Sequence, residues 1–224
     1  MTARAAPNAG RASGPTGTLC ALVAIKSRAQ CKSRLAHALS TPARLALVRA
    51  MLATVLDAVS EARCVQDVLV ISPEREGVPS GMRVLADSGQ SLNAALSYAH
   101  AQLQALGHAE ALILPADLPH LTGQEIDAFV QAGRARGFAI APDHAHRGTN
   151  ALFMTARTPF TFRFGADSLR LHLEEACARG FTPAVVELPG LALDVDEPVD
   201  LQALAGRYRE NLHEEAAWQT PARL

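Results

Sequence analysis

Short apolar runs alternate with longer amphipathic segments along almost the whole chain. The runs "LCALVAI" at 19–25 and "ALILP" at 111–115 are apolar throughout, as in strands that are buried on both faces. The segment at 41–62 repeats apolar residues at intervals of three and four, which is the spacing of one helix face. This alternation predicts an α/β fold in which a mostly parallel mixed sheet is the middle of three layers.

The expected elements follow the apolar runs, and many of them stop at glycine or proline. We predict strands at 19–25, 67–72, 82–87, 111–115, 138–143, 150–155, 183–188 and 191–196. We predict helices at 41–62, 91–106, 122–137 and 167–180, and a last one from about Glu197. Thr41 is expected to cap the first helix, with Pro42 at its first helical position.

Composition excludes several classes of protein. Lys plus Arg number 21 and Asp plus Glu number 22, so the formal net charge of −1 argues against a general nucleic-acid or membrane-surface binder. There is no apolar run long enough to span a bilayer and no secretory signal. Four scattered cysteines are typical of reduced thiols in the cytoplasm. We expect one domain at 18–207 between tails at 1–17 and 208–224.

The segment "AIKSRAQCKSRLA" leads out of the first expected strand and is rich in basic residues: Lys26, Arg28, Lys32 and Arg34. In open α/β sheets, ligands bind beyond the carboxyl ends of the strands. The segment has no glycine and therefore no phosphate-binding glycine loop, so side-chain cations would have to bind phosphate. The alternative is a solvated basic loop.

The stretch "ADSGQSLNAAL" at 86–96 joins a short expected strand to a helix. Gly89 permits a tight turn, and Ser91 can cap the helix. Small polar residues at a helix N-terminus suit a base or a phosphate, which makes Asp87, Gly89, Ser91 and Asn93 candidate nucleotide-binding residues. An ordinary helix cap is the alternative.

The stretch "LILPADLPHLT" carries a strand into a carboxylate between two prolines. Pro115 and Pro119 hold Asp117 in a turn at the sheet edge. Without a second carboxylate nearby, Asp117 would be interpreted as a residue that forms the turn. A second carboxylate at a neighbouring strand end would make it half of a Mg²⁺ site, because Mg²⁺ binds one or two carboxylates together with waters and phosphate oxygens.

That second carboxylate is available in "ALDVDEPVDL". Asp194 and Asp196 alternate around Val195, which places them on the same side of an extended strand. Asp196 is alternatively the N-cap of the last helix, with Pro198 in its first turn. Both roles are compatible, because a cap uses only one carboxylate oxygen.

A fourth polar group comes from two segments. Thr149 and Asn150 stand at the mouth of an expected strand, and Gly165 and Ser168 stand at the start of a helix. Free N–H groups at such a helix start favour an anion, so these residues are candidates for binding a phosphate or a carboxylate. Otherwise Asp167 or Ser168 is only the helix cap.

Five of these stretches occur in an order that is specific as a set. "KSRL", "PADLPHLT", "GTNAL", "FGADS" and "LALDVDEPVDL" resemble the phospholactate guanylyltransferase family over residues 19–204. That family makes the side-chain precursor of the deazaflavin coenzyme F(420). The resemblance implies a nucleotide-diphospho-sugar transferase-like fold. It also implies transfer of GMP from GTP to 2-phospholactate, phosphoenolpyruvate or 3-phosphoglycerate, with release of pyrophosphate.

The resemblance also implies roles for residues. Asp117 and an aspartate of "DVD" look like the metal ligands, and Thr149, Gly165 and Ser168 look like the contacts to the acid. Pro115 and Ala116 join the candidate nucleotide-binding residues, and Lys26, Lys32 and Arg34 are expected to offset triphosphate charge. Glu197 departs from the family's pattern, which has threonine there.

Partners follow from the same resemblance. We expect GTP, a small phospho-acid, a downstream transferase that accepts a labile product, and a homodimer. The alternatives are a nucleotidyltransferase for molybdopterin or a sugar phosphate, and a non-catalytic nucleotide-binding protein. The missing glycine-rich loop disfavours the first alternative, and the intact acidic residues disfavour the second.

Overall fold

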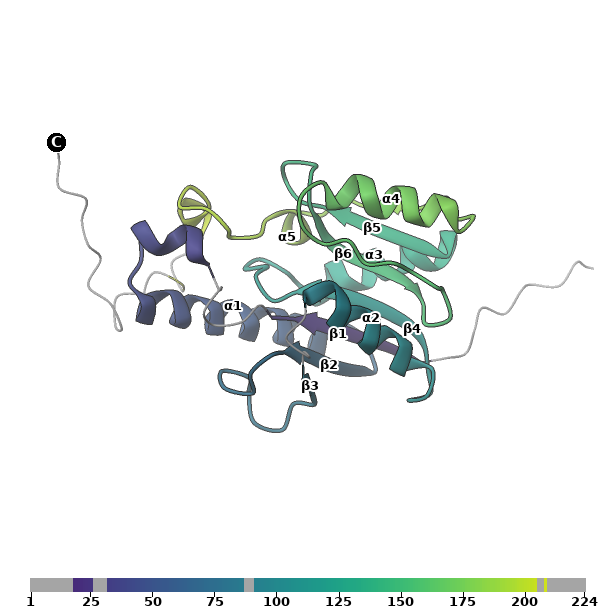
Figure 1. Ribbon diagram of the computed structural model, residues 1–224, viewed down its shortest axis with the longest axis horizontal. Coiled ribbons are helices and arrows are strands. Elements are labelled where there is room, and N and C mark those ends of the chain that lie inside the picture. The colour runs from purple at the N-terminus through teal and green to yellow at the C-terminus, as the bar shows by residue number, and fades with distance from the viewer. Residues whose placement is uncertain (1–17, 26–31, 87–90, 205–207, 209–224) are drawn as a thin grey trace, which may run out of the picture.

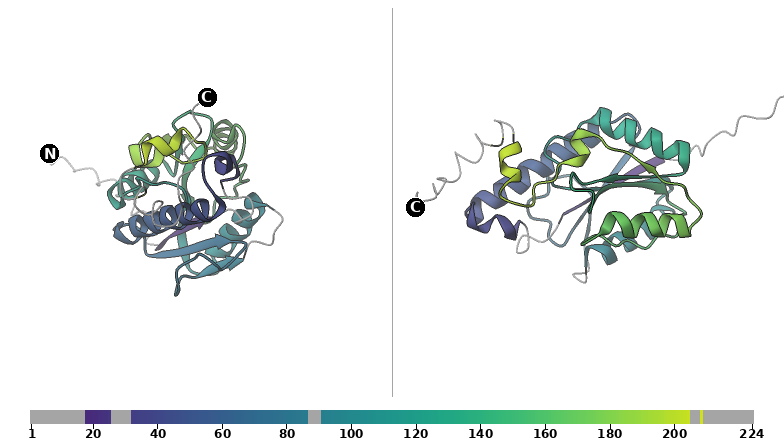
Figure 2. Two further views of the ribbon diagram at one scale, coloured as in Figure 1. Left: turned by 90° about the vertical axis from the view of Figure 1, so that its left-hand side faces the viewer. Right: turned by 90° about the horizontal axis from the view of Figure 1, so that it is seen from above.

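A seven-stranded sheet lies between two layers of helices (Figure 1). The computed structural model describes residues 18–25, 32–86, 91–204 and 208. The strand order is β3-β2-β1-β4-β6-β5-β7. The predicted three-layer α/β fold with a mixed sheet is therefore confirmed, and Figure 2 shows the sheet edge-on between its helices.

The elements follow the predicted order. The strands are β1 Thr18–Ala24, β2 Asp67–Ser72, β3 Val84–Ala86, β4 His108–Pro115, β5 Phe138–Pro142, β6 Thr149–Thr155 and β7 Ala184–Val185. The α-helices are α1 Thr41–Glu61, α2 Leu92–Leu103, α3 Gly123–Arg136, α4 Ser168–Ala178 and α5 Pro189–Ala192. Short 3₁₀ helices are η1 Ser33–His37 and η2 Asp200–Ala203. Of the helices in the described residues, none is long and apolar enough to cross a membrane.

The pairing of the strands decides which ends meet at one edge of the sheet. β1 runs parallel to β2 and β4, and β6 runs antiparallel to β4. Leu152 of β6 lies opposite Ile113 of β4, so the start of β6 is level with the residues that follow β4. The loops after β1 and β4 and the residues that open β6 therefore share one edge.

Alternation along β1 builds the two faces of the core. Leu19, Ala21 and Val23 pack with α1 and α3, whereas Cys20 and Leu22 pack on the other face with α2 and α4. This is the period of two expected of a strand that is buried on both sides. The sequence predicts the helical layers because each helix has one apolar face.

A third apolar cluster lies beyond the sheet. It joins η1 and the first half of α1 to the C-terminal segment through Leu35, Leu47, Val195 and Tyr208, and Figure 1 shows these elements at one end of the molecule. Tyr208 is 2% exposed although it follows the expected domain end at 207. The packed core therefore includes at least this residue of the expected tail.

Three predictions about local structure are wrong. The N-cap of α1 is Ser40, whose side chain accepts from the backbone N–H of Ala43 at 3.4 Å, and not Thr41. Residues 191–196 do not form a strand, since α5 ends at Ala192 and irregular structure follows. In a strand, the backbone of this segment would pair with a neighbouring strand. Instead, it forms hydrogen bonds with the side chains of Asn150 and Asp200. The helix expected from Glu197 begins only with η2 at Asp200.

Candidate active site

Three aspartates gather at the edge of the sheet where β4 ends. Carboxylate oxygens of Asp117, Asp194 and Asp196 all lie within 4.8 Å of one another. The turn that carries Asp117 is held from both sides, since the Ala116 N–H donates to the Ala24 carbonyl at 3.1 Å and the Tyr208 hydroxyl donates to the Pro119 carbonyl at 3.0 Å. The structure thus brings Asp117 close to both aspartates of "DVD", of which the resemblance implied one as a metal ligand, and metal binding by these residues stays a prediction.

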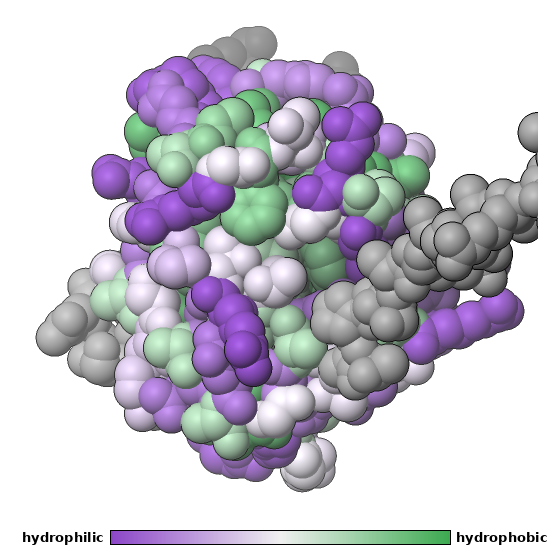
Figure 3. All heavy atoms as spheres, turned by 90° about the vertical axis from the view of Figure 1, so that its right-hand side faces the viewer, coloured by the Kyte–Doolittle hydropathy of each residue, from purple (hydrophilic) through white to green (hydrophobic). Residues whose placement is uncertain are grey.

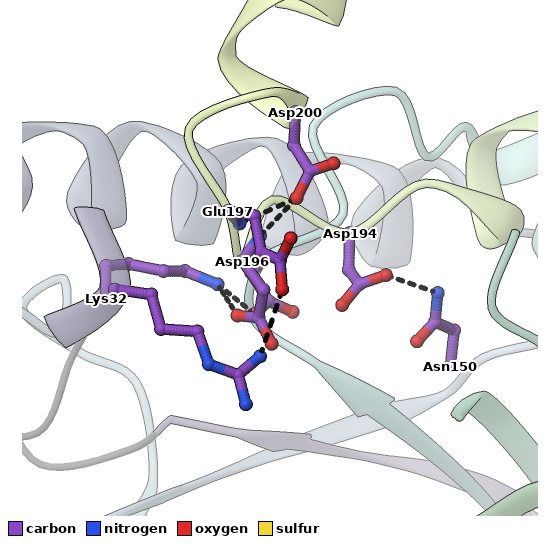
Figure 4. Close-up of polar contacts among 8 residues, drawn as sticks. Lys32, Asn150, Asp194, Asp196, Glu197 and Asp200 are labelled. Atoms are coloured by element: carbon purple, nitrogen blue, oxygen red, sulfur yellow. Dashed lines mark hydrogen bonds and ion pairs between the residues drawn. The ribbon is translucent and has the colours of Figure 1, made fainter. Parts of the chain in front are cut away.

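Lys32 lies at one side of this acidic cluster, where it contacts two of the three aspartates (Figure 4). Its ammonium group donates to Asp117 Oδ2, and to Asp196 Oδ1 at 2.8 Å, and its side chain is only 4% exposed. Burial disfavours the charged ammonium, but the charges of Asp117 and Asp196 outweigh burial and raise the pKa of Lys32 above its ordinary value. Lys32 therefore stays positively charged and neutralises part of the cluster.

The backbone at Lys32 is unusual. Its φ of 52° and ψ of 39° are left-handed, a conformation that a residue with a β-carbon rarely adopts. Such conformations persist when the surroundings over-determine them, and they cluster at functional sites. Here the two carboxylates and the packing of Leu35 beneath η1 hold the residue in place.

Asp194 has a clearly raised pKa within the acidic cluster. Burial, and then the charges of Asp117 and Asp196, raise the pKa of Asp194 to about 6, although a hydrogen bond from Asn150 opposes the shift. Counting only the described residues, three carboxylates and the single ammonium group of Lys32 make up the cluster, which leaves an excess of negative charge among them. This arrangement suits an additional cation.

Two further residues hold the segment that carries Asp194 and Asp196. The Asn150 amide donates to the Leu191 carbonyl at 2.9 Å and to Asp194 Oδ1 at 3.3 Å. Asp200 Oδ2 accepts from the backbone N–H groups of Asp196 at 2.9 Å and Glu197 at 2.7 Å (Figure 4). The cap of this turn is thus Asp200 and not Asp196.

Asp200 was not among the predicted site residues. The sequence feature that could have indicated its role is an acidic residue four positions after Asp196. Asn150 is predicted to contact substrate, but its amide is engaged with two carbonyls of α5 and with Asp194 in the segment after it. The structure therefore places Asn150 where it orients Asp194. A direct contact between Asn150 and substrate stays a prediction.

The residues predicted to bind the acid lie around the start of α4. Thr149 and Ser168 are buried, and Gly165 is exposed with a φ of 133°. The expectation that the N–H groups at this helix start are free is wrong for two of them. The Ser168 N–H donates to the Gly165 carbonyl at 3.3 Å, and the Leu169 N–H donates to the Arg147 carbonyl at 3.1 Å. An anion there would need side-chain donors as well.

The predicted nucleotide-binding residues are only partly described. Ser91 caps α2 by accepting from the Ala94 N–H at 3.2 Å. The Asn93 amide pairs with both backbone groups of Phe164, at 2.8 and 3.1 Å, and so ties α2 to the segment before α4. Pro115 ends β4 and Ala116 follows it at the acidic cluster. Lys26, Arg28, Asp87 and Gly89 lie outside the described residues.

Arg34 lies on η1 beside Lys32 but points to the exposed side of the cluster. Its guanidinium is 3.8 Å from Glu197, and both side chains are well exposed. An exposed pair at this distance contributes little to stability, so Arg34 remains available to a ligand. Its predicted catalytic role stays a prediction.

A second group of potential ligands lies at the opposite end of the sheet. Cys20, Asp67 and His108 bring their side chains within 4.8 Å of one another. Asp67 already accepts from Arg83 at 2.6 Å and from the Val68 N–H at 2.8 Å. Because Arg83 balances the one carboxylate, and burial and then Asp67 raise the pKa of the Cys20 thiol to about 12, this group lacks the excess negative charge that a cation requires.

Comparison with known proteins shows the family to which the chain belongs. The profile of the family described as "Guanylyl transferase CofC like" matches residues 19–209. The chain belongs to this family. The phosphoenolpyruvate guanylyltransferase of Sphaerobacter thermophilus is 37% identical over 193 residues, covering 84% of this chain and 93% of the relative. The 3-phospho-D-glycerate guanylyltransferase of Phenylobacterium zucineum is 37% identical over 193 residues, covering 83% and 88%.

Solved structures agree with the fold. A protein from Desulfovibrio desulfuricans G20 described as a nucleotide-diphospho-sugar transferase superposes with a TM-score of 0.73 at 17% identity, covering 88% of this chain and 94% of that one. The 4-diphosphocytidyl-2C-methyl-D-erythritol synthase of Anaerococcus prevotii superposes with a TM-score of 0.57 at 10% identity, covering 87% and 96%. These likenesses establish the nucleotide-diphospho-sugar transferase-like fold. Together with the family, they make this CofC-like protein a nucleotidyltransferase.

Proposed function

We propose that this CofC-like enzyme condenses GTP with a small phosphorylated acid to give a guanosine diphospho-acid and pyrophosphate. The observation that carries the proposal is the cluster of Asp117, Asp194 and Asp196, two of which contact Lys32, at the sheet edge of a chain that belongs to a guanylyl transferase family. The candidate acids are 3-phospho-D-glycerate, 2-phospho-L-lactate and phosphoenolpyruvate. The two relatives named above have the same sequence identity to this chain, and they are named for different acids. An experiment must therefore determine which acid this enzyme uses.

Mg²⁺ is proposed as the metal of this site. The donors fit, because Mg²⁺ prefers carboxylate oxygens, and among the described residues three carboxylates against the one ammonium group of Lys32 leave a negative charge that the metal would balance. Asp117, Asp196 and Asp194 would hold it. When bound, it supplies positive charge to phosphate oxygens at the reacting centre.

The chain's own residues would act by alignment and by neutralising charge. An oxygen of the acid's phosphate attacks the α-phosphorus of GTP, and the bond from that phosphorus to the β-phosphate oxygen breaks, releasing pyrophosphate. The attacking oxygen is already anionic, so no general base is needed. Lys26, Lys32 and Arg34 would offset the charge of the triphosphate, and donors aimed at developing charge lower the barrier.

The acid and the nucleotide would occupy different parts of the edge. Thr149, Gly165 and Ser168 lie beside the start of β6 and α4 and would contact the acid. Asp87, Gly89, Ser91 and Asn93 with Pro115 and Ala116 would contact the nucleotide. The turn between β5 and β6, which contains two exposed histidines and Arg147, would add donors for an acid with an extra hydroxyl such as 3-phospho-D-glycerate.

The wider setting follows from the proposed reaction. A labile diphospho-acid would pass to a downstream transferase in deazaflavin coenzyme F(420) biosynthesis, in the cytoplasm. A homodimer also stays a prediction. On the face of the described residues seen in Figure 3, hydrophilic and hydrophobic side chains are interspersed. Among the described residues of the whole molecule, the exposed large apolar side chains are Tyr98, Leu106, Val185 and Val199.

The test is release of pyrophosphate by the purified enzyme with Mg²⁺, GTP and each acid. We expect release only when an acid is present, and we expect ATP to be a poor replacement for GTP. A coupled assay with the three acids in competition ranks them. Turnover with none of the three would contradict the proposal.

Asp117→Asn supplies the matched variant. It should abolish activity while the fold is retained, because it removes a ligand charge without changing side-chain size. Asp57→Asn, on the exposed side of α1, is the control and should leave activity unchanged. Full activity in Asp117→Asn would remove Asp117 from the metal site.

A further inference from the structure

His172 is a buried histidine that contacts a residue of the proposed acid site. It lies on α4 with no exposed surface, one helical turn after Ser168. Its Nε2 lies 2.9 Å from the backbone nitrogen of Arg163, and its Nδ1 lies 3.0 Å from Thr149 Oγ1. The ring therefore connects the segment before α4 to the first residue of β6.

The first of these contacts decides where the ring proton lies. A backbone N–H can only donate, so Nε2 must be unprotonated and must accept from Arg163. A neutral imidazole then carries its proton on Nδ1. Burial, and then the charge of Arg163, lower the pKa of His172 to about 4, so the ring stays neutral near pH 7.

The second contact determines the role of the Thr149 hydroxyl in hydrogen bonding. With its proton on Nδ1, His172 donates to Thr149 Oγ1, so the hydroxyl oxygen is the acceptor of this bond. The hydroxyl hydrogen is then left for another partner, and among the described residues Thr149 Oγ1 has none besides His172. A carboxylate or phosphate oxygen only accepts hydrogen bonds, so it matches this hydroxyl.

Aromatic packing prevents the ring from turning. The ring of Phe164 meets His172 edge-on with centroids 4.7 Å apart, and the ring of Phe160 lies 5.7 Å away on a tilt. A flipped ring would place a carbon against the Arg163 N–H in a buried environment, leaving a donor unsatisfied. The orientation of the ring is thus determined by its surroundings and not by the ligand.

We propose that His172 is a positioning residue for the acid substrate, because it makes the Thr149 hydroxyl a donor to the acid's carboxylate or phosphate. The proposal rests on the proposed function, which places Thr149 at the acid. His172 does not touch the acid, and its effect is transmitted through one hydroxyl. Thr149 lies level with the residues that follow β4, and its neighbour Asn150 contacts Asp194, so this hydroxyl belongs to the same edge as the acidic cluster.

A double-mutant cycle tests this transmission. Thr149→Val removes the hydroxyl and keeps the shape, and His172→Gln removes the fixed ring donor. Each should raise the KM for the acid by roughly 10- to 100-fold, the range for a lost hydrogen bond to a charged group, and leave the KM for GTP unchanged. The double variant should be no worse than Thr149→Val alone. Additive effects would overturn the proposal, because a merely structural His172 would act independently of Thr149.

Two controls complete the cycle. Thr149→Ser keeps the hydroxyl and should retain most of the affinity for the acid. His108→Gln disturbs a similar pair at the opposite end of the sheet, where His108 Nδ1 lies 2.9 Å from Thr18 Oγ1, and it should not change the KM for the acid. A rise in this KM with His108→Gln equal to that with His172→Gln would also contradict the proposal.

A spectroscopic measurement needs no turnover and does not require any variant to fold. In protein labelled with ¹⁵N-histidine, the His172 nitrogens should report a single neutral tautomer with the proton on Nδ1. A proton on Nε2, or a mixture of tautomers, would overturn the proposal. Because this reading is made without substrate, its failure is distinguishable from failure of the proposed reaction.

Discussion

The ammonium group of Lys32 lies 2.8 Å from Asp196 Oδ1, although 164 residues separate the two in the sequence. The same ammonium contacts Asp117, so one side chain joins the loop after β1, the turn after β4 and the segment after α5. A lysine fits this position because its charge is compact and can lie between two carboxylates. Lys32 thus balances part of the charge that the three aspartates bring together.

Lys32→Met should weaken the metal-free protein and strengthen metal binding. Removing the ammonium leaves carboxylates that repel each other, and because Asp117 and Asp196 are 18% and 36% exposed we expect a loss of about 1–3 kcal/mol in unfolding free energy. Mn²⁺ should bind more tightly without nucleotide, since it no longer competes with a cation. Calorimetric titration measures this affinity. Lys32→Arg keeps the charge and is the control; equal Mn²⁺ affinity in the wild type and Lys32→Met would contradict the prediction.

Asp200→Ala should loosen the turn that presents Asp196. Its carboxylate accepts from two backbone N–H groups, so we expect metal affinity to fall by roughly 10- to 100-fold, as for other residues that orient ligands. Asp127 is a matched control, because it also accepts from two backbone N–H groups, those of Arg63 at 3.3 Å and Cys64 at 2.9 Å. Asp127→Ala should not change metal affinity. Equal losses in the two variants would show that the effect is only general destabilisation.

The lowered pKa of His172 predicts a dependence of stability on pH. The unfolded ring takes up a proton near pH 6.5 and the folded ring only at about 4, so the unfolded state binds more protons in between. Stability from this group is therefore present above pH 6.5 and is lost as the pH falls towards 4, by on the order of 3 kcal/mol. Urea unfolding of the wild type and His172→Gln across this range measures the difference. Parallel curves would contradict the prediction.

Gly133→Ala should destabilise the protein although alanine favours helix. A β-carbon at this position of α3 would lie 2.3 Å from Cδ1 of the buried Phe153 ring. Overpacking of this kind costs about 1–3 kcal/mol, which exceeds the gain of about 1 kcal/mol in helix propensity. Thermal unfolding measures the change. Gln131→Ala, at an exposed position of the same helix, is the control and should be neutral or slightly stabilising; a more stable Gly133→Ala would mean that the ring moves aside at no cost.

Local pattern was enough to predict most of the elements. Apolar alternation and helical spacing depend only on neighbouring residues, so β1, β2, α1 and α3 lie close to their predicted ranges. The capping box of Thr122 and Glu125 and the left-handed Gly137 bound α3 for the same reason. The rule that parallel strands end at one edge predicted that Asp117 lies near the "DVD" aspartates. The structure places their carboxylates within 4.8 Å of one another, although the segment that carries "DVD" is not a strand.

Local pattern failed where distant groups bind the backbone. Apolar and polar residues alternate over 191–196 as they would in a strand. However, the Asn150 amide donates to the Leu191 carbonyl, and the Asp200 carboxylate accepts from the Asp196 N–H. For the same reason the sequence did not predict the hydrogen bond from Lys32 to Asp117 or the one from His172 to Thr149. Neither contact joins residues at a regular spacing in the sequence. The order of apolar runs along the chain was sufficient to predict the three layers of the fold and the edge of the sheet at which the candidate site lies. The partner of each polar side chain depended on the folded chain, because buried donors and acceptors pair with whatever the packing brings to them.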